Sequence, residues 1–275
     1  MATNKLIQSI FLLSLVNSVP VEAQKVIYED DNPKVKVALP DNGADGRAVV
    51  ICPGGGYNHA GKPKEADDWI PFFTRQGIAV ATLMYDLPNG DKDVPLGQLR
   101  RVFALLRRHA SDWHIDAGKI GIMGSSAGGH LATTFATHEP VADRPAFQIL
   151  FYPVVTLMSK PHRGMAQRFL GTTDEKQRAA YSNELQVDSL TSPAFIIAAA
   201  DDNIINPDNS IDYYRALRAH GISATLHIYP SGRHGFGFTD AFPYKPQLLD
   251  ELAAWLKTLR LSENEGKQGN ADHRK

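Results

Sequence analysis

A serine between two glycines is the residue of this chain best placed for chemistry. The run Gly-Ser-Ser-Ala-Gly at residues 124–128 directly follows a β-rich run at 119–123 and precedes a helical pattern. A sharp strand-to-helix turn exposes such a serine hydroxyl at the end of the strand, and the glycines make room for its strained backbone. Gly-x-Ser-x-Gly also occurs by chance in ordinary glycine-rich turns, but this context favours Ser126 as a nucleophile.

A serine hydroxyl needs a base at neutral pH, and ten histidines compete for that role. His234 lies on the glycine-rich stretch 231–237 after the last predicted strand, where a side chain can reach across the end of a sheet. It also stands last in the chain order Ser…Asp…His, which favours it as the base. His130 is expected to pack or cap on the helix that follows Ser126. Three others are expected to end helices or to lie within a strand: His109, His220 and His227.

An imidazole base needs a carboxylate that fixes its tautomer and stabilises its protonated form. Asp201 and Asp202 directly follow the buried run 194–200, which is the expected place for this acid. Residue types alone do not choose between the two, because either one could instead accept hydrogen bonds in a turn or at a helix cap.

A glycine triplet supplies the fourth component. The run Cys-Pro-Gly-Gly-Gly-Tyr at 52–57 follows the predicted strand 47–51. Without Cβ atoms in the way, the N–H of Gly55 or Gly56 can approach a developing oxyanion, with the N–H of Ala127 as a second donor. Alone, the triplet would be only a flexible turn. Together the four signals stand in the one chain order that acyl-transfer chemistry on a parallel sheet requires, so a serine nucleophile with its base and oxyanion donors is predicted.

The elements that must position these residues alternate between strands and helices. Short apolar runs, typical of strands covered on both faces, alternate with amphipathic helical patterns. This order predicts an α/β fold: a mostly parallel central sheet with helices on both faces, and a site beyond the carboxyl ends of the strands. The predicted strands are 47–52, 78–85, 119–123, 147–152, 194–199 and 224–229, and the predicted helices include 99–109, 207–220 and 248–256.

The 275 residues, 43% of them apolar, suit one large domain, which we expect over 24–261. Residues 1–23 are predicted to be a signal peptide, because Lys5 and an apolar run at 6–16 precede the cleavage pattern Val-Glu-Ala. A buried N-terminal element is the alternative, and the run is too short to cross a bilayer. The polar tail 262–275 is predicted to be disordered. A periplasmic or secreted protein, not inserted in the membrane after cleavage, is therefore expected.

Charge and cysteine content narrow the range of partners. A formal net charge of −1 leaves no basic excess for nucleic acid and no polybasic stretch for a membrane surface. Cys52 is the single cysteine, so neither an internal disulfide nor a thiol cluster for a metal is expected. No metal-ligand spacing occurs, and Asp67-Asp68 is expected to be solvated in a helical stretch, so no metal or cofactor is predicted. Nothing in the sequence indicates an oligomeric state.

Four segments carry a resemblance to a known family. They are Cys-Pro-Gly-Gly-Gly-Tyr (52–57), Gly-Ser-Ser-Ala-Gly-Gly-His-Leu-Ala (124–132), Ala-Asp-Asp-Asn-Ile-Ile-Asn-Pro-Asp-Asn-Ser (200–210) and Gly-Arg-His-Gly-Phe-Gly (232–237). They resemble bacterial carbohydrate esterases of the α/β-hydrolase superfamily, the acetyl xylan esterase and feruloyl esterase relatives, over about 34–261. The resemblance implies an α/β-hydrolase fold, Asp202 as the acid, and metal-free removal of acetyl groups from xylan or xylo-oligosaccharides. The implied partner is an acetylated plant polysaccharide or oligosaccharide.

The chain departs from that group at two positions. Asn206 replaces a proline and can cap the following helix, which is neutral for catalysis. Asp86 replaces an arginine, which bears on substrate specificity more than on reaction type. Candidate substrate contacts are Tyr57, Asn58 and Tyr152, with His59 beside them, each with rim packing or turn formation as the alternative; residues 158–188 are expected to form a cap that leaves a shallow pocket.

Three rival functions share parts of this pattern. A feruloyl or general carboxylesterase would use the same residues, because the volume of the acyl pocket cannot be read from sequence. A small peptidase of the prolyl-oligopeptidase kind would share the catalytic domain, but such enzymes usually add a propeller domain, which we do not expect here. A non-catalytic binding protein on the same scaffold would typically lack a member of the Ser–His–Asp set, and none is missing.

Overall fold

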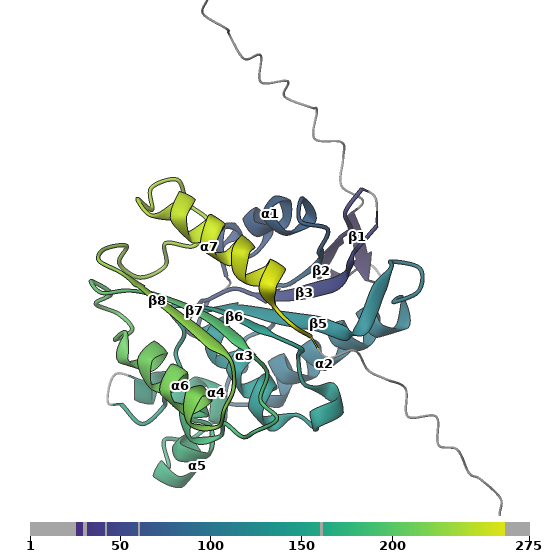
Figure 1. The fold of residues 1–275 in the computed structure, drawn as a ribbon. Coiled ribbons are helices and arrows are strands. Elements are labelled where there is room, and N and C mark those ends of the chain that lie inside the picture. Colours follow the sequence, from purple (N-terminus) through teal and green to yellow (C-terminus); the bar gives the residue numbers. More distant parts are fainter. Residues whose placement is uncertain (1–25, 30–31, 42, 60, 160–161, 262–275) are drawn as a thin grey trace, which may run out of the picture.

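The computed structural model describes residues 26–29, 32–41, 43–59, 61–159 and 162–261, and the predicted signal peptide and polar tail lie outside them. Eight strands form one sheet in the order β1-β2-β4-β3-β5-β6-β7-β8 (Figure 1). The strands from β4 to β8 are parallel to one another, while β2 runs antiparallel to β4 and β1 antiparallel to β2. The predicted mostly parallel sheet is confirmed. The strands are β1 (Val26–Glu29), β2 (Asn32–Ala38), β3 (Gly46–Cys52), β4 (Ala79–Leu83), β5 (Ile115–Ser125), β6 (Gln148–Phe151), β7 (Ala194–Ala199) and β8 (Ala224–Tyr229).

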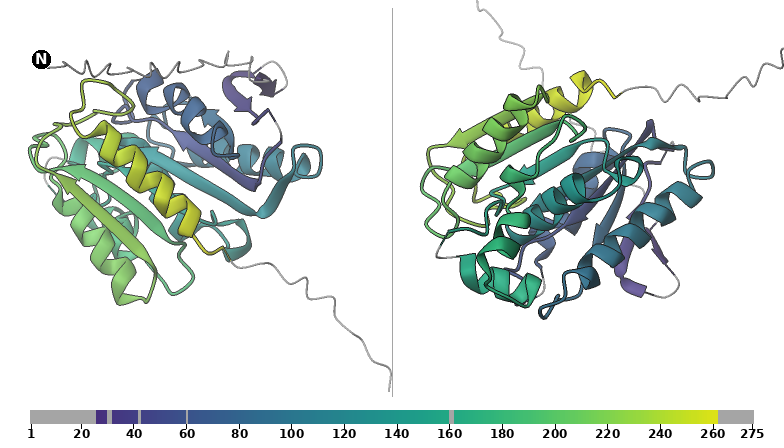
Figure 2. Two further views of the ribbon diagram at one scale, coloured as in Figure 1. Left: turned by 45° about the horizontal axis from the view of Figure 1, so that its top comes forward. Right: turned by 90° about the horizontal axis from the view of Figure 1, so that it is seen from below.

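Helices cover both faces of the sheet, as expected from strands that are apolar on both sides. Figure 2 shows α7 crossing the sheet on one side (left), and the view from below shows the teal and green helices on the other. The α-helices are α1 (Ile70–Thr74), α2 (Asp93–Arg108), α3 (Ala127–His138), α4 (Arg163–Leu170), α5 (Glu175–Ala180), α6 (Asp208–Ala219) and α7 (Lys245–Thr258). Short 3₁₀ turns are η1 (Pro63–Glu65), η2 (Asp67–Trp69), η3 (Val141–Asp143) and η5 (Asn183–Leu185).

The strand β3 shows how the sheet divides the core into two layers. Successive side chains of a strand point to opposite faces, so Val49 and Ile51 pack with α1 and α7, while Val50 packs with α2, α3 and α6. All three side chains are fully buried. A continuous apolar run is therefore needed in each central strand, which explains why these strands were recognisable from sequence.

The helix α6 begins one residue later than predicted. The side-chain Oδ1 of Asn206 accepts a hydrogen bond from the N–H of Asp208 at 2.9 Å. This bond satisfies a backbone donor at the start of a helix that would otherwise lack a partner. Asn206 thus caps α6 as expected, in place of a proline that could not do so with its side chain.

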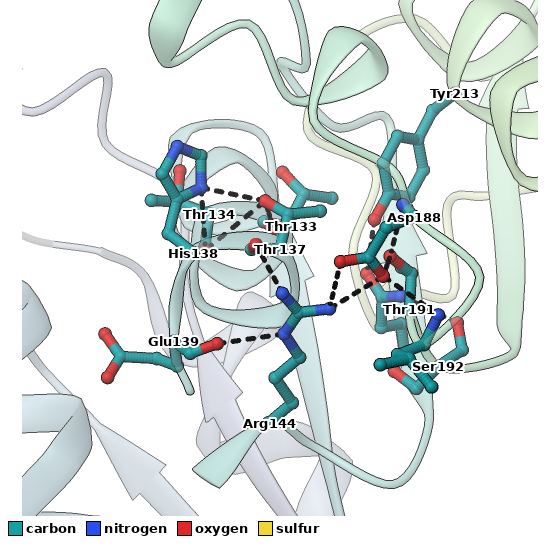
Figure 3. A network of polar contacts seen from close by, with 12 residues as sticks. Thr133, Thr134, Thr137, His138, Glu139, Arg144, Asp188, Thr191, Ser192 and Tyr213 are labelled. Carbon is teal, nitrogen blue, oxygen red and sulfur yellow. Dashed lines mark hydrogen bonds and ion pairs between the residues drawn. The ribbon is translucent and has the colours of Figure 1, made fainter. Parts of the chain in front are cut away.

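Arg144 holds the end of α3 against the segment before β7 (Figure 3). Its Nη1 donates to both carboxyl oxygens of Asp188 at 2.8 Å, and its Nη2 donates to the carbonyl of Thr137 at 2.9 Å. The Nε donates to the carbonyl of Glu139, also at 2.9 Å. These bonds satisfy carbonyls left open at the C-terminus of α3, and so fix the helix whose other end carries Ser126.

In the described residues, no helix has the length and apolar character needed to cross a membrane. Asp67 lies in η2 with its side chain 35% exposed, as expected of a solvated helical stretch. The same side chain also accepts a hydrogen bond from the hydroxyl of Thr82 at 2.8 Å and pairs with Lys36. Asp68 is exposed to solvent, as expected.

Candidate active site

Three predicted residues from distant parts of the chain meet at the carboxyl edge of the sheet. Ser126 follows β5, Asp202 follows β7 and His234 follows β8. The Nε2 of His234 lies 2.9 Å from the Oγ of Ser126, and its Nδ1 lies 2.7 Å from the Oδ2 of Asp202. The side chains of Asp202 and His234 are 1% and 17% exposed, which shields the hydrogen bond between them from water while leaving the imidazole accessible. This hydrogen-bonded chain can remove a proton from the serine hydroxyl.

The turn at Ser126 has the strained backbone expected of an exposed nucleophile. Its φ of 53° lies in the left-handed region that residues with a Cβ rarely adopt. The flanking glycines are required by close packing, because a Cβ on Gly124 would lie 2.2 Å from the carbonyl oxygen of Gly128. Likewise a Cβ on Gly128 would lie 2.1 Å from the carbonyl oxygen of Cys52. The two glycines therefore allow the start of α3 to pack directly against the end of β3.

Strained backbone also occurs at three other residues around Ser126. Tyr57, Tyr152 and Arg233 have φ values of 58°, 36° and 55°, and they follow β3, β6 and β8 respectively. Strain of this kind costs about 1–3 kcal/mol per residue and persists only where the surrounding structure holds it in place. Such strain clusters at active sites, so its presence at these four residues accords with the predicted site.

The structure separates the two candidate aspartates. Asp202 uses Oδ2 for His234, while its Oδ1 accepts hydrogen bonds from the N–H groups of Ile204 and Ile205, both at 2.9 Å. Asp201 instead accepts from the N–H groups of Gly232 and Arg233 at 2.8 and 2.7 Å. Asp202 therefore contacts the imidazole, and Asp201 anchors the loop that carries it.

The glycine triplet lies beside Ser126, and its conformation requires glycine. Gly55 has a φ of 139°, and a Cβ there would lie 2.3 Å from the carbonyl oxygen of His59. That loop is closed by hydrogen bonds from the N–H groups of Asn58 and His59 to the carbonyl of Gly55, at 3.0 and 3.2 Å. The N–H of Gly54 is already bonded to Glu65. Among the described residues, the N–H groups of Gly55 and Gly56 have no such acceptor, so they stay candidates for the predicted oxyanion donors, together with Ala127 at the start of α3.

Glu65 was not predicted from sequence, yet it joins three segments of the site. Its Oε2 accepts from the N–H of Gly54 at 3.0 Å, and its Oε1 accepts from the hydroxyl of Tyr152 at 2.7 Å. The same hydroxyl accepts from the N–H of Gly237 at 3.0 Å, on the loop of His234. Because Glu65 is 7% exposed, these bonds are shielded from water. A glutamate in a short turn gave no periodic or motif signal that could have revealed this role.

Replacing Glu65 with alanine is expected to lower both stability and activity. The change leaves the N–H of Gly54 and the hydroxyl of Tyr152 buried without acceptors, which costs about 2–5 kcal/mol of unfolding free energy. The rate of catalysis should fall at least about tenfold, since a loosened loop misplaces the reacting groups. Urea unfolding and initial rates measure the two effects. Asp68→Ala, an exposed neighbour, is the control, and an unfolding free energy of Glu65→Ala equal to that of the control would contradict the role.

Ser126 and His234 open onto a cavity of about 390 Å³. Its apolar lining comes mainly from residues after β6, on α4 and after β7, and the glycine triplet and η1 form the opposite part. Of the predicted cap at 158–188, the described residues include α4 and α5, and α4 contributes to the cavity wall. The lining includes Val154, Met165, Ile204, Ile205, His59, His162 and Arg168.

The predicted substrate contacts need correction. Tyr57 is 1% exposed and its hydroxyl bonds the Nδ1 of His130 at 3.1 Å, so its side chain lies beneath the site rather than in the cavity. Tyr152 is also 1% exposed and packs its ring against that of His234, with centroids 4.9 Å apart. Asn58 is exposed but does not line the cavity, whereas His59 does. Tyr152 therefore supports the imidazole, and the contacts available to a substrate come from other residues.

His162 was also missed, and it suits recognition of a hydroxyl group. Its Nδ1 donates to the carbonyl of Thr156 at 2.7 Å, so the proton sits on that nitrogen and Nε2 is left as an acceptor. Burial lowers the pKa of His162, which keeps the ring neutral near pH 7. Asp86, the departure noted in the sequence, pairs with Lys34 and does not line the cavity.

His130 is a buried structural histidine, as expected. It lies between the hydroxyl of Tyr57 and the carbonyl of Tyr181, which its Nε2 contacts at 2.9 Å. Because burial lowers the pKa of His130 to about 3, the ring stays neutral in the folded protein at any pH where the enzyme would work. It cannot serve as the base, since both ring nitrogens are occupied.

This burial predicts a loss of stability in mild acid. In the unfolded chain His130 takes up a proton near pH 6.5, whereas the folded protein does not until about pH 3. The unfolded state thus binds more protons between these values, and unfolding free energy falls as the pH drops below 6.5. The expected loss at pH 5 is about 2 kcal/mol. Urea unfolding at pH 7.5 and 5.0 measures it, and a ¹⁵N spectrum with a protonated His130 ring in folded protein at pH 5 would contradict it.

The remaining candidates for other chemistry are accounted for. Burial raises the pKa of the Cys52 thiol, so this residue stays protonated and unreactive. Within the described ranges, no group of three or more His, Cys, Asp or Glu side chains is arranged to hold a metal ion.

A sheet of this strand order, with a serine, a histidine and an aspartate joined at its carboxyl edge, defines a class of hydrolases. The chain belongs to the family described as the alpha/beta hydrolase fold, whose pattern matches residues 49–238. The predicted fold class is thereby confirmed.

The relatives of the chain include an acetylxylan esterase and a xylanase. It is 42% identical over 242 residues to an acetylxylan esterase of Xylanibacter ruminicola, covering 85% of this chain and 50% of that protein. It is 29% identical to endo-1,4-beta-xylanase B of Butyrivibrio fibrisolvens, covering 68% of this chain and 32% of that protein. The chain thus spans half or less of the length of these relatives. The predicted resemblance to carbohydrate esterases is confirmed.

A solved structure with a similar fold also carries the name of an ester hydrolase. An acetyl ester-xyloside bifunctional hydrolase from Caldicellulosiruptor lactoaceticus superposes with a TM-score of 0.74 at 28% identity, covering 89% of this chain and 93% of that one.

Proposed function

We propose that this protein is a serine esterase that removes acetyl groups from xylan or xylo-oligosaccharides through an acyl-enzyme. The observation that carries the proposal is the hydrogen-bonded chain from Ser126 through His234 to Asp202, with bonds of 2.9 and 2.7 Å. The identity of 42% to an acetylxylan esterase supports the choice of acyl group and sugar.

The proposed mechanism follows from the site. The Oγ of Ser126 attacks the acetyl carbonyl carbon while its proton passes to Nε2 of His234, and Asp202 stabilises the imidazolium. The oxyanion of the tetrahedral intermediate accepts from the N–H of Ala127 and of Gly55 or Gly56. The intermediate collapses as the sugar oxygen leaves with the proton from His234. Water then attacks the acetyl-serine, gives a proton to His234, and acetate is released with the serine restored.

The cavity supports a small acyl group on a sugar. Val154, Met165 and Ile205 offer apolar contacts next to Ser126, of the kind that suits an acetyl methyl group. His162 offers an acceptor for a sugar hydroxyl. Action on a plant polymer outside the cytoplasm accords with the predicted signal peptide at 1–23, and we propose a periplasmic or secreted location.

The decisive experiment measures acetate release from acetylated xylan and acetylated xylo-oligosaccharides, beside methyl ferulate, simple alkyl esters and an aminoacyl-proline amide. We expect the acetylated sugars to be the best substrates, because the cavity combines a small apolar part with polar groups. Faster hydrolysis of ferulate or long alkyl esters would instead favour a feruloyl or general carboxylesterase. Cleavage of the amide alone would favour a peptidase.

A further inference from the structure

The cavity at Ser126 carries more positive than negative charge. Its charged lining residues within the described ranges are Lys62, Lys64, Arg168 and a single carboxyl, Glu65. The carboxyl is 7% exposed, and its two oxygens already accept from Gly54 and Tyr152. The charge available to a ligand is therefore positive, although the whole chain has a formal net charge of −1.

Arg168, on α4, presents a suitable geometry for a carboxylate. Its Nε donates to the carbonyl of Gly56 at 2.7 Å, which fixes the guanidinium beside the glycine triplet. Its Nη1 and Nη2 have no acceptor among the residues that the structure describes, and Arg168 makes no ion pair with them. Two parallel N–H groups on the outer edge of a guanidinium match the two oxygens of a carboxylate.

The two lysines differ in what they can offer. The ammonium group of Lys64 donates to the carbonyl of Gly235 and so holds the loop of His234. Lys62 is exposed, and its ammonium group has no hydrogen-bond or ion-pair partner in the described part of the chain. A free ammonium group in the same cavity as Arg168 raises the positive potential that an arriving anion meets.

We propose that Arg168, assisted by Lys62, binds a carboxylate on the sugar side of the substrate, so that the enzyme prefers acetyl esters on acidic xylo-oligosaccharides that carry a uronic-acid substituent. This inference rests on the proposed function. The acetyl group is uncharged, so the negative group that complements these cations belongs to the alcohol part of the ester. The carboxylate is bound and not altered, and the reaction at Ser126 is unchanged.

The test compares kcat/KM for acetate release from two acetylated xylo-oligosaccharides, one with a glucuronic acid substituent and one without it. Wild-type protein should prefer the acidic substrate about tenfold or more, as one charge-assisted contact allows. Arg168→Gln should bring the ratio of the two values close to one. Arg163→Gln is the matched control, because Arg163 begins the same helix, is exposed and does not line the cavity. Raising NaCl from 20 to 300 mM should reduce the wild-type preference.

Two results would overturn the inference while leaving the proposed function intact. One is equal kcat/KM for both oligosaccharides with wild-type protein. The other is an Arg168→Gln protein that loses the same factor on both, which would mean that Arg168 only positions Gly56. A third result would also overturn the inference: a preference for p-nitrophenyl hemisuccinate over p-nitrophenyl acetate would place the carboxylate on the acyl side of the substrate. Absence of acetate release from either oligosaccharide would remove the proposed function and the inference with it.

Discussion

Ser126→Ala protein should hydrolyse p-nitrophenyl acetate about 10⁴-fold more slowly than wild type, or slower still. The reason is that alanine removes the only protein atom that bonds to the acyl carbon in the proposed mechanism, while the base and the oxyanion donors remain. The substitution removes the hydrogen bond between the Oγ of Ser126 and His234. Folding should persist, because close packing of the backbone at Gly124 and Gly128 holds the turn. Initial rates of p-nitrophenyl acetate hydrolysis measure the activity, and thermal unfolding followed by circular dichroism measures the folding.

The control for this prediction is Ser125→Ala, which removes a hydroxyl from the neighbouring residue at the end of β5. We expect its activity to stay within about threefold of wild type. A fluorophosphonate probe should label wild-type and Ser125→Ala protein but not Ser126→Ala. Turnover of Ser126→Ala within tenfold of wild type, or labelling of it by the probe, would show that the nucleophile lies elsewhere.

Asp202→Asn should cost about 10³–10⁴-fold in kcat with little change in the fold. An asparagine can keep the hydrogen bonds from Ile204 and Ile205 through its oxygen. Its amide group would then donate to Nδ1 of His234, which forces the ring proton onto Nε2. That nitrogen could no longer accept the proton of Ser126, so the base is lost although its position is kept.

Asp201→Asn is the matched comparison, because the two aspartates are adjacent and the change is identical. Its oxygen can still accept from Gly232 and Arg233, as the carboxylate does. We therefore expect a decrease of less than about tenfold, because only the strength of two loop bonds changes. A larger loss in Asp201→Asn than in Asp202→Asn would reverse the assignment. Steady-state kinetics on one acetyl ester, at one pH, suffices to compare them.

The strands and the larger helices were predictable because their residues must satisfy local rules. A central strand buried on both faces needs a continuous apolar run, and β7 occupies 194–199 as predicted. The predicted apolar positions of α2, Leu99, Val102, Phe103 and Leu106, are all buried in one layer of the core. Boundaries were less predictable: α2 begins at Asp93, six residues before the predicted start.

The residues Ser126, Asp202 and His234 could be proposed from sequence because each one lies in the segment that follows a predicted strand. Parallel strands bring their carboxyl ends to one edge of a sheet, so position after a strand already implies convergence. The choice between Asp201 and Asp202 had no such local basis. It depends on which carboxyl group faces the imidazole, and only the tertiary structure reveals that contact.

The amino-acid sequence by itself determined the order of strands and helices, the glycine-flanked serine and the apolar runs that place three polar residues at one sheet edge. These follow from interactions between residues close together in the chain. Tertiary structure alone decided that Glu65 bonds Tyr152, 87 positions away, that Arg168 reaches Gly56, and that Tyr57 is buried beneath the site. Such contacts join segments whose separation in the chain carries no pattern, because they depend on how packed layers meet.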